Sequence, residues 1–192
     1  MTVTDFEITS ALRRSLPIDD GFMKLLDLDR CYSVSRVPVE GGGELVIYNV
    51  HLSAYTADDS IVRGQLDMLY ADMAAEYSNG NYVVCGGDFN CDLLTDSSAI
   101  FGVEGDFSWA QPFDTARLPE GFTLVAPCDA ENPVPSARNA DGAYVPGESF
   151  VITLDGFIVS DNVEVVSAEV ADTGFEYSDH NPVYMEFVLM PH

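Results

Sequence analysis

Polar side chains of a few chemical kinds gather where the apolar segments of this chain begin or end. The apolar segments are 45–50, 82–85, 150–154 and 182–189, and the polar residues beside them are His51, Asp88, Asn90, Asp155, Asp179 and His180. In layered α/β folds, strand ends and the loops that follow them form the ligand crevice. Carboxylate, imidazole and amide groups collected at such an edge fit a metal-assisted hydrolase.

The hydropathy pattern predicts many strands and one long helix. Strands are expected at 2–8, 32–39, 44–52, 82–85, 149–159, 163–170 and 182–189, and a glycine turn at 40–43 joins two of them as a hairpin. Apolar residues at three- and four-residue spacing predict a helix over 58–77. Residues 10–29 are expected to form a loop, and 97–134 a short helix with a long loop. Strands in mixed order with few helices suggest an α/β sandwich.

Charge is the composition feature that narrows the choice of partners. The 192 residues suit one domain, 1–192, and carry 8 Lys and Arg against 32 Asp and Glu, for a formal net charge of −24. Sequence-independent nucleic-acid binding depends on cations that neutralise phosphates, so this balance argues against a nuclease of bulk DNA. It is compatible with a small or lipid-linked phosphoester held by a few local groups and a metal ion. The simplest interpretation of most of the charge is a solvated acidic surface.

The sequence gives no sign of a zinc site or of a membrane span. The four cysteines form no Cys-x-x-Cys pair and have no Cys/His zinc spacing. No apolar run approaches the roughly 20 residues that a transmembrane helix needs, and the first residues lack the pattern of a signal peptide. We therefore expect the chain as given to be soluble, and the location of the full-length protein, membrane-anchored and secreted forms included, is left open.

The histidines sharpen the prediction of a hydrolase. His51 and His180 both stand beside the Asp/Asn clusters, and the third, His192, is terminal. Phosphodiester hydrolysis needs a deprotonated water, a neutralised phosphate and a protonated leaving oxygen. A histidine oriented by a carboxylate can supply the base, and a hard cation such as Mg²⁺, held by oxygen ligands, can neutralise the phosphate.

Four motifs, in this order, resemble those of the endonuclease/exonuclease/phosphatase superfamily. They are Asn49-Val50-His51-Leu52, Gly86-Gly87-Asp88-Phe89-Asn90, Leu154-Asp155-Gly156-Phe157 and Ser178-Asp179-His180-Asn181-Pro182-Val183. That superfamily includes pancreatic-type deoxyribonucleases, abasic-site endonucleases, neutral sphingomyelinases and inositol polyphosphate phosphatases. The resemblance covers residues 10–189. It implies a four-layer α/β sandwich, in which two mixed β-sheets pack face to face with helices outside.

The resemblance also implies roles for the three residues closest to the chemistry. His180 resembles the base that acts on the attacking water. Asp155 resembles the carboxylate that orients and charges that imidazole, and a turn cap is the alternative. His51 resembles the second histidine of the superfamily, which binds phosphate or assists the leaving group.

The remaining matched residues are expected to handle the metal and the phosphate. Asp88 resembles the aspartate that directs the water or the leaving group, and Asn90 the phosphate-binding asparagine; a simple Asx turn is the alternative for this pair. Asp179 resembles the carboxylate at the metal, so Asp179, Asp88 and Asn90 are the expected ligands of Mg²⁺ or Mn²⁺. Arg30 is a candidate for phosphate contact, with a surface salt bridge as the alternative.

The chain departs from the superfamily before His51. Relatives begin with a strand that bears an asparagine, followed by a Gln-Glu pair whose glutamate binds the metal, and neither is present in this sequence. We therefore expect an N-terminally truncated member with its leading strands missing. Exposed sheet edges should then favour self-association, and metal binding should be weaker. The alternative function is an inactive remnant that acts as a binding or interaction module.

Overall fold

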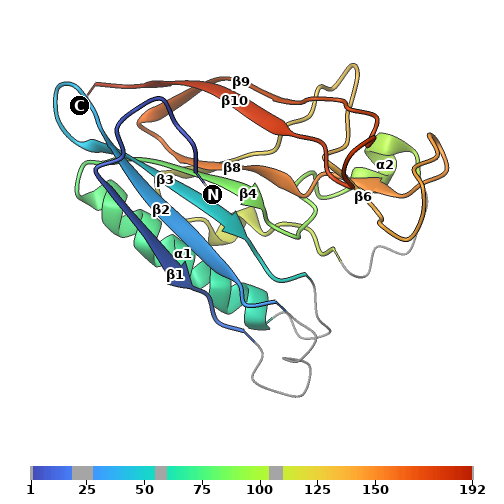
Figure 1. The fold of residues 1–192 in the computed structure, drawn as a ribbon, viewed down its shortest axis with the longest axis horizontal. Helices are drawn as coiled ribbons and strands as arrows, with labels where there is room; N and C mark the ends of the chain where they lie inside the picture. Colours follow the sequence, from blue (N-terminus) through green and yellow to red (C-terminus); the bar gives the residue numbers. More distant parts are fainter. Residues whose placement is uncertain (1, 19–27, 55–59, 104–109, 192) are drawn as a thin grey trace.

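The computed structural model describes residues 2–18, 28–54, 60–103 and 110–191. The elements, in chain order, are β1 (Ser10–Ser15), β2 (Cys31–Pro38), β3 (Glu44–His51), α1 (Ser60–Ser78), β4 (Tyr82–Asp88), α2 (Ser97–Phe101), η2 (Thr115–Arg117), β5 (Phe122–Val125), β6 (Ala137–Arg138), β7 (Val151–Ile152), β8 (Asp155–Ser160), β9 (Val163–Val170) and β10 (Val183–Leu189) (Figure 1). None of the helices in these ranges is long and apolar enough to cross a membrane.

A six-stranded mixed sheet forms the centre of the structure. Its strand order is β1-β2-β3-β4-β8-β5, and β3 and β4 are its parallel pair. A parallel pair needs a crossover connection, and α1 supplies it. The apolar face of α1, with Leu66, Leu69 and Met73 buried, packs on one face of the sheet against Tyr48 and Val83. The predicted hairpin and helix are confirmed here, although residues 58 and 59 of the predicted helix lie outside the described ranges.

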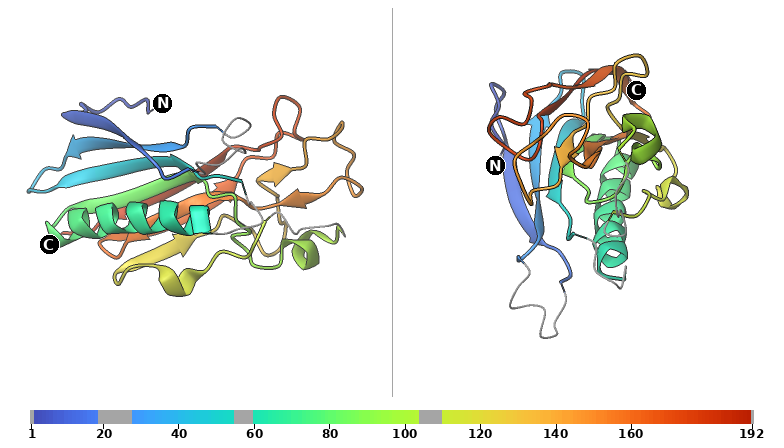
Figure 2. Two further views of the ribbon diagram at one scale, coloured as in Figure 1. Left: turned by 90° about the horizontal axis from the view of Figure 1, so that it is seen from below. Right: turned by 90° about the vertical axis from the view of Figure 1, so that its right-hand side faces the viewer.

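A two-stranded antiparallel ribbon, β9–β10, covers the opposite face of the central sheet (Figure 2). Its inward side chains, among them Val163 and Phe187, pack against Tyr82, Val84 and Val159. The expected α/β sandwich with two packed sheets is therefore confirmed. The second sheet consists of this ribbon, and within the described residues no helix covers its outer face.

Two predictions near the N-terminus are wrong. Residues 2–9 form no strand, and the first strand is β1, in a segment that was predicted to be a loop. β1 pairs along its full length with β2, as the edge strand of the sheet. All six of its residues are exposed. Their sequence, Ser-Ala-Leu-Arg-Arg-Ser, does not alternate between apolar and polar residues, so hydropathy predicts no strand there. Pairing with β2, rather than hydropathy, decides where the chain is extended.

The predicted strand 149–159 is two strands. β7 pairs with β6 in a small separate sheet, whereas β8 lies between β4 and β5 in the central sheet. The break falls at Thr153 and Leu154, where the Leu154 amide donates to the Ser136 side chain, 2.9 Å away, instead of continuing a ladder. The segment 97–134 contains the expected short helix, α2, but also β5, which was not predicted.

Candidate active site

Sheet register brings three of the expected residues into one row. His51 on β3 is the register partner of Asp88 on β4, and Asp88 is the register partner of Asp155 on β8. Neighbouring strands lie about 4.8 Å apart, so side chains far apart in sequence become neighbours across three strands. His51 Nε2 lies 3.3 Å from Asp88 Oδ2.

Glycines beside the two aspartates allow the backbones in this row to approach closely. Gly87, just before Asp88, has a φ of +147°, and a Cβ there would lie 1.9 Å from the carbonyl oxygen of Val50. A Cβ on Gly156, just after Asp155, would lie 2.8 Å from the carbonyl oxygen of Val125. Only a residue without a side chain fits either position, which explains the glycine in both motifs.

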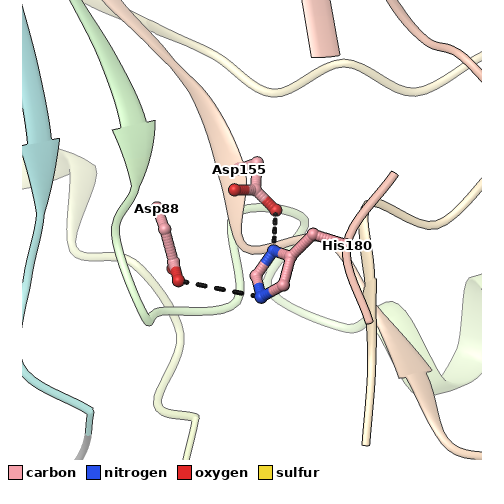
Figure 3. A group of neighbouring side chains, drawn as sticks. All are labelled: Asp88, Asp155 and His180. Carbon is pink, nitrogen blue, oxygen red and sulfur yellow. Dashed lines mark hydrogen bonds and ion pairs between the residues drawn. The ribbon is translucent and has the colours of Figure 1, made fainter. Parts of the chain in front are cut away.

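His180 reaches this row from a loop rather than from a strand of the central sheet. An isolated bridge joins it to Ala137, and the amide of the next residue, Asn181, donates to the carbonyl of Ser136 over 2.7 Å. The His180 Nδ1 atom lies 2.8 Å from Asp155 Oδ2 (Figure 3). An ionised carboxylate can only accept, so Nδ1 carries the proton of the neutral ring. The lone pair of the ring is then on Nε2, which faces Asp88 Oδ2 at 3.9 Å and can accept a proton.

Ser136 is a site residue that the sequence analysis missed. Its side chain is fully buried, and its hydroxyl donates to Asp155 Oδ2 over 2.8 Å. The Ser136 Oγ atom also accepts from the backbone amides of Leu154 and Asp155, at 2.9 and 3.0 Å. Ser136 therefore fixes the carboxylate that holds His180. It lies at the start of a polar, turn-rich segment without periodicity, so no sequence pattern separates it from an ordinary loop serine.

The electrostatics of the site shift its groups in different directions. The hydrogen bond to Asp155 raises the pKa of His180 above its usual value, against the effect of burial. Burial lowers the pKa of His51, although the charge of Asp88 opposes this shift. Burial and the nearby charge of Asp155 raise the pKa of the Asp88 carboxyl. The two imidazoles therefore differ in basicity although they face the same carboxylate.

Asp88, Asp155 and His180 also form a group that could hold a metal ion. Each offers one ligand atom, and these atoms lie within 4.8 Å of one another (Figure 3). Burial, and after it the charge of Asp155, raise the pKa of the Asp88 carboxyl, and a bound cation would favour the ionised form of both carboxylates. The donor set fits a divalent cation that accepts oxygen ligands. Of the residues expected to bind metal, only Asp88 belongs to this group.

Comparison with solved structures finds a similar fold in several phosphoesterases. ANGEL2, a 2′,3′-cyclic phosphatase, matches with a TM-score of 0.61 at 16% identity over 95% of this chain and 67% of its own. The catalytic domain of human Nocturnin matches with a TM-score of 0.59 at 17% identity, over 96% of this chain and 60% of its own. An endonuclease/exonuclease/phosphatase from Beutenbergia cavernae DSM 12333 matches with a TM-score of 0.59 at 16% identity, over 95% of this chain and 45% of its own.

The chain has the endonuclease/exonuclease/phosphatase fold. It spans 60% of the Nocturnin domain and 45% of the Beutenbergia protein. No protein-family model and no curated protein matches the sequence. At 13–18% identity the structural matches establish the fold alone.

Within this fold, the other expected residues lie around the row. The Asn90 amide donates to Asp88 Oδ1 over 2.8 Å, and its side-chain Nδ2 donates to the Leu52 carbonyl over 2.9 Å. The charge of Asp179 contributes to the raised pKa of His180. The positive charge of Arg30 helps to lower the pKa of His51, so Arg30 lies within electrostatic reach of the site.

Proposed function

We propose that this chain is a metal-dependent hydrolase of phosphoester bonds, a member of the endonuclease/exonuclease/phosphatase superfamily, in which His180 activates the attacking water. One observation carries the proposal: His180 Nδ1 is 2.8 Å from Asp155, which leaves Nε2 as the basic atom, facing Asp88 across 3.9 Å. A general base needs this arrangement, with one ring nitrogen oriented by a carboxylate and the other open to the reacting proton.

The reaction follows from these positions. Water gives a proton to His180 Nε2 as its oxygen forms a bond to phosphorus, and Asp155 stabilises the imidazolium that results. The bond from phosphorus to the leaving oxygen breaks, and that oxygen takes a proton from solvent water while the His51 ring donates a hydrogen bond to it. Asp88, whose Oδ2 faces both imidazoles, positions the water or the leaving group between them.

The phosphate and the cation would be held by neighbouring residues. Asn90 and Arg30 are proposed to contact the phosphate, together with His51. Asp88, with Asn90 and Asp179 as further oxygen donors, is proposed to hold Mg²⁺ or Mn²⁺, and Asp155 and His180 border the same position. When bound, the cation would neutralise charge on the phosphate. The net charge of −24 favours a small or lipid-linked phosphoester over bulk DNA.

The test is hydrolysis of bis(4-nitrophenyl) phosphate with Mg²⁺, with Mn²⁺ and with a chelator. We expect activity that needs the metal and falls by about a thousandfold in His180→Ala, in line with the loss of a general base. Asp5→Asn, at an exposed residue outside the site, is the control and should retain full activity. Equal rates for the wild type and His180→Ala at every metal concentration would contradict the proposal.

One observation favours a second candidate, an inactive protein that acts as an interaction module. Val166, Tyr184 and Val188 are 62%, 46% and 52% exposed on the β9–β10 ribbon. Exposed apolar groups of this kind mark surfaces that associate with another chain, and self-association would bury them. Sedimentation of a protein that proves inactive in the assay above would test this: a dimer supports an interaction module, and a monomer opposes self-association.

A further inference from the structure

We propose that the cavity beside Asn90 binds a flat ring carried by the substrate, so that the chain acts on small phosphoesters with a nucleoside or aryl substituent. This inference rests on the proposed function, because the ring would be a substituent of the phosphoester that His180 hydrolyses. It narrows the substrate class, since the phosphate-handling residues alone do not separate ring-bearing from lipid-linked esters.

The cavity lies between the start of α1 and the segment 111–117. Its volume is 240 Å³, and the residues that matter for the argument are Leu66, Asn90, Gln111, Phe113, Arg63 and Arg117. Ligand pockets for drug-sized molecules commonly measure about 300–1,000 Å³. This cavity lies below that range, so it fits one compact ring system and is too small for a long acyl chain.

Asn90 connects the cavity to the catalytic row. It lines the cavity, and its amide donates to Asp88 Oδ1 over 2.8 Å. Its backbone has a φ of +50°, and its side chain is held by the Leu52 carbonyl. A phosphate that contacts Asn90 and Asp88 would therefore have this cavity beside it, within reach of its substituent.

The inner wall of the cavity is apolar and suits the face of a ring. Val62, Leu66 and Phe113 line it and are at most 9% exposed. Phe113 is held edge-on against Phe89, with ring centroids 5.8 Å apart and planes at 80°. A fixed aromatic side chain offers a further edge or face to a ligand ring, and such pairs are favourable beyond their buried area.

The outer wall is polar and less acidic than the rest of the molecule. Arg63 and Arg117 line the cavity, and they are two of only eight Lys and Arg residues in a chain of net charge −24. Asp67 holds Arg117 at 2.5 Å, and Asp114, the carboxylate of the lining, accepts from the Ala116 amide. Guanidinium groups stack on flat rings, so this wall suits the face of a flat ring.

The test compares three phosphate monoesters as ligands, by titration calorimetry in the presence of Mg²⁺. Adenosine 5′-monophosphate and phenyl phosphate carry a ring, whereas methyl phosphate does not. We expect the ring-bearing ligands to bind about tenfold more tightly than methyl phosphate, which corresponds to about 1.4 kcal/mol. If only the adenosine ligand shows the gain, the ring is a nucleobase; if both do, any flat ring is accepted.

Two variants test whether the preference for ring-bearing ligands arises in this cavity. Phe113→Leu removes the aromatic side chain from the cavity wall and should weaken the preference for a ring while leaving methyl phosphate binding unchanged. Phe122→Leu makes the same change at a buried aromatic residue that does not line the cavity and should keep the preference. Equal affinity for all three ligands in the wild type, or no binding of any, would overturn the inference. Hydrolysis of bis(4-nitrophenyl) phosphate is scored separately, so a ring preference without hydrolysis would reject the proposed function but not the ring site.

Discussion

The two histidine–aspartate pairs of the site are built in different ways. His51 and Asp88 are register partners on adjacent strands, and their closest atoms are 3.3 Å apart with the His51 side chain 55% exposed. His180 comes from a loop and meets Asp155 over 2.8 Å, with its side chain 33% exposed. The residue on the regular element is thus the less constrained of the two.

The difference teaches that a strand fixes where a residue sits but not how its ring is turned. The Asp155 carboxylate is itself held by the buried hydroxyl of Ser136, so the orientation of His180 is set through two successive hydrogen bonds. His51 has no comparable chain of bonds among the described contacts. A fixed ring suits a base that must aim one lone pair, and a ring with more freedom suits a group that follows a departing oxygen.

The largest expected effect comes from breaking the pair that orients its ring. Asp155→Asn keeps the shape of the side chain but can present an N–H to His180 Nδ1, which favours the wrong tautomer. By analogy with the same change in hydrolase triads, kcat should fall by about 10³–10⁴-fold.

His51→Ala should lower kcat by about 10–100-fold, because a less oriented group contributes less to the transition state. Steady-state kinetics on one phosphodiester measure both values, and equal losses would show that the two pairs do not differ in role.

A smaller effect is expected from the residue behind Asp155. Ser136→Ala removes a hydroxyl that makes three hydrogen bonds inside the protein. Leaving buried groups unpaired costs about 1–3 kcal/mol, so the free energy of unfolding in urea should fall by that amount and kcat by about tenfold. Ser149→Ala, at an exposed turn where the hydroxyl accepts one amide, is the matched control and should lose less than about 1 kcal/mol. Unchanged kcat in Ser136→Ala would mean that Asp155 is held without it.

The smallest expected effect is a difference between the pKa values of the two histidines, which needs no measurement of rate. In metal-free protein, NMR titration should give His180 a pKa above 6.5 and His51 a pKa below it. The raised pKa of His180 adds stability that is fully present below pH 6.5 and is lost as pH rises through the folded value. The lowered pKa of His51 has the opposite sign, because the unfolded chain binds that proton more tightly and stability falls as pH drops below 6.5. A common midpoint for both rings would contradict the assigned contacts.

The parts of the site that lie on strands could be predicted from the sequence. Apolar runs with polar ends predict β3 and β4, and the motifs mark His51, Asp88 and Asp155 as candidates, which the strand register brings into one row. Ser136 could not be predicted, because its importance lies in hydrogen bonds to a segment about 20 residues away and not in any local pattern. The break between β7 and β8 depends on the same bonds. The choice of metal ligands stays a prediction, with Asp88 shared between the expected set and the geometric group.

The three residues of the row across β3, β4 and β8 take their positions from the pairing of the strands, so their placement depends on the folding of the sheet. A slip of one residue between strands would send alternate side chains to the other face of the sheet, so His51, Asp88 and Asp155 are in place only when the whole sheet is formed. The amides of β4, between two hydrogen-bonded neighbours, should accordingly be among the slowest to exchange with deuterium. His180 belongs to no strand of that sheet and is held by separate contacts, because the neighbouring Asn181 donates from its amide to the Ser136 carbonyl and from its side chain to the Pro135 carbonyl. The base and the row are therefore placed by different sets of bonds, so we expect the His180 amide and the β4 amides to exchange with deuterium at different rates.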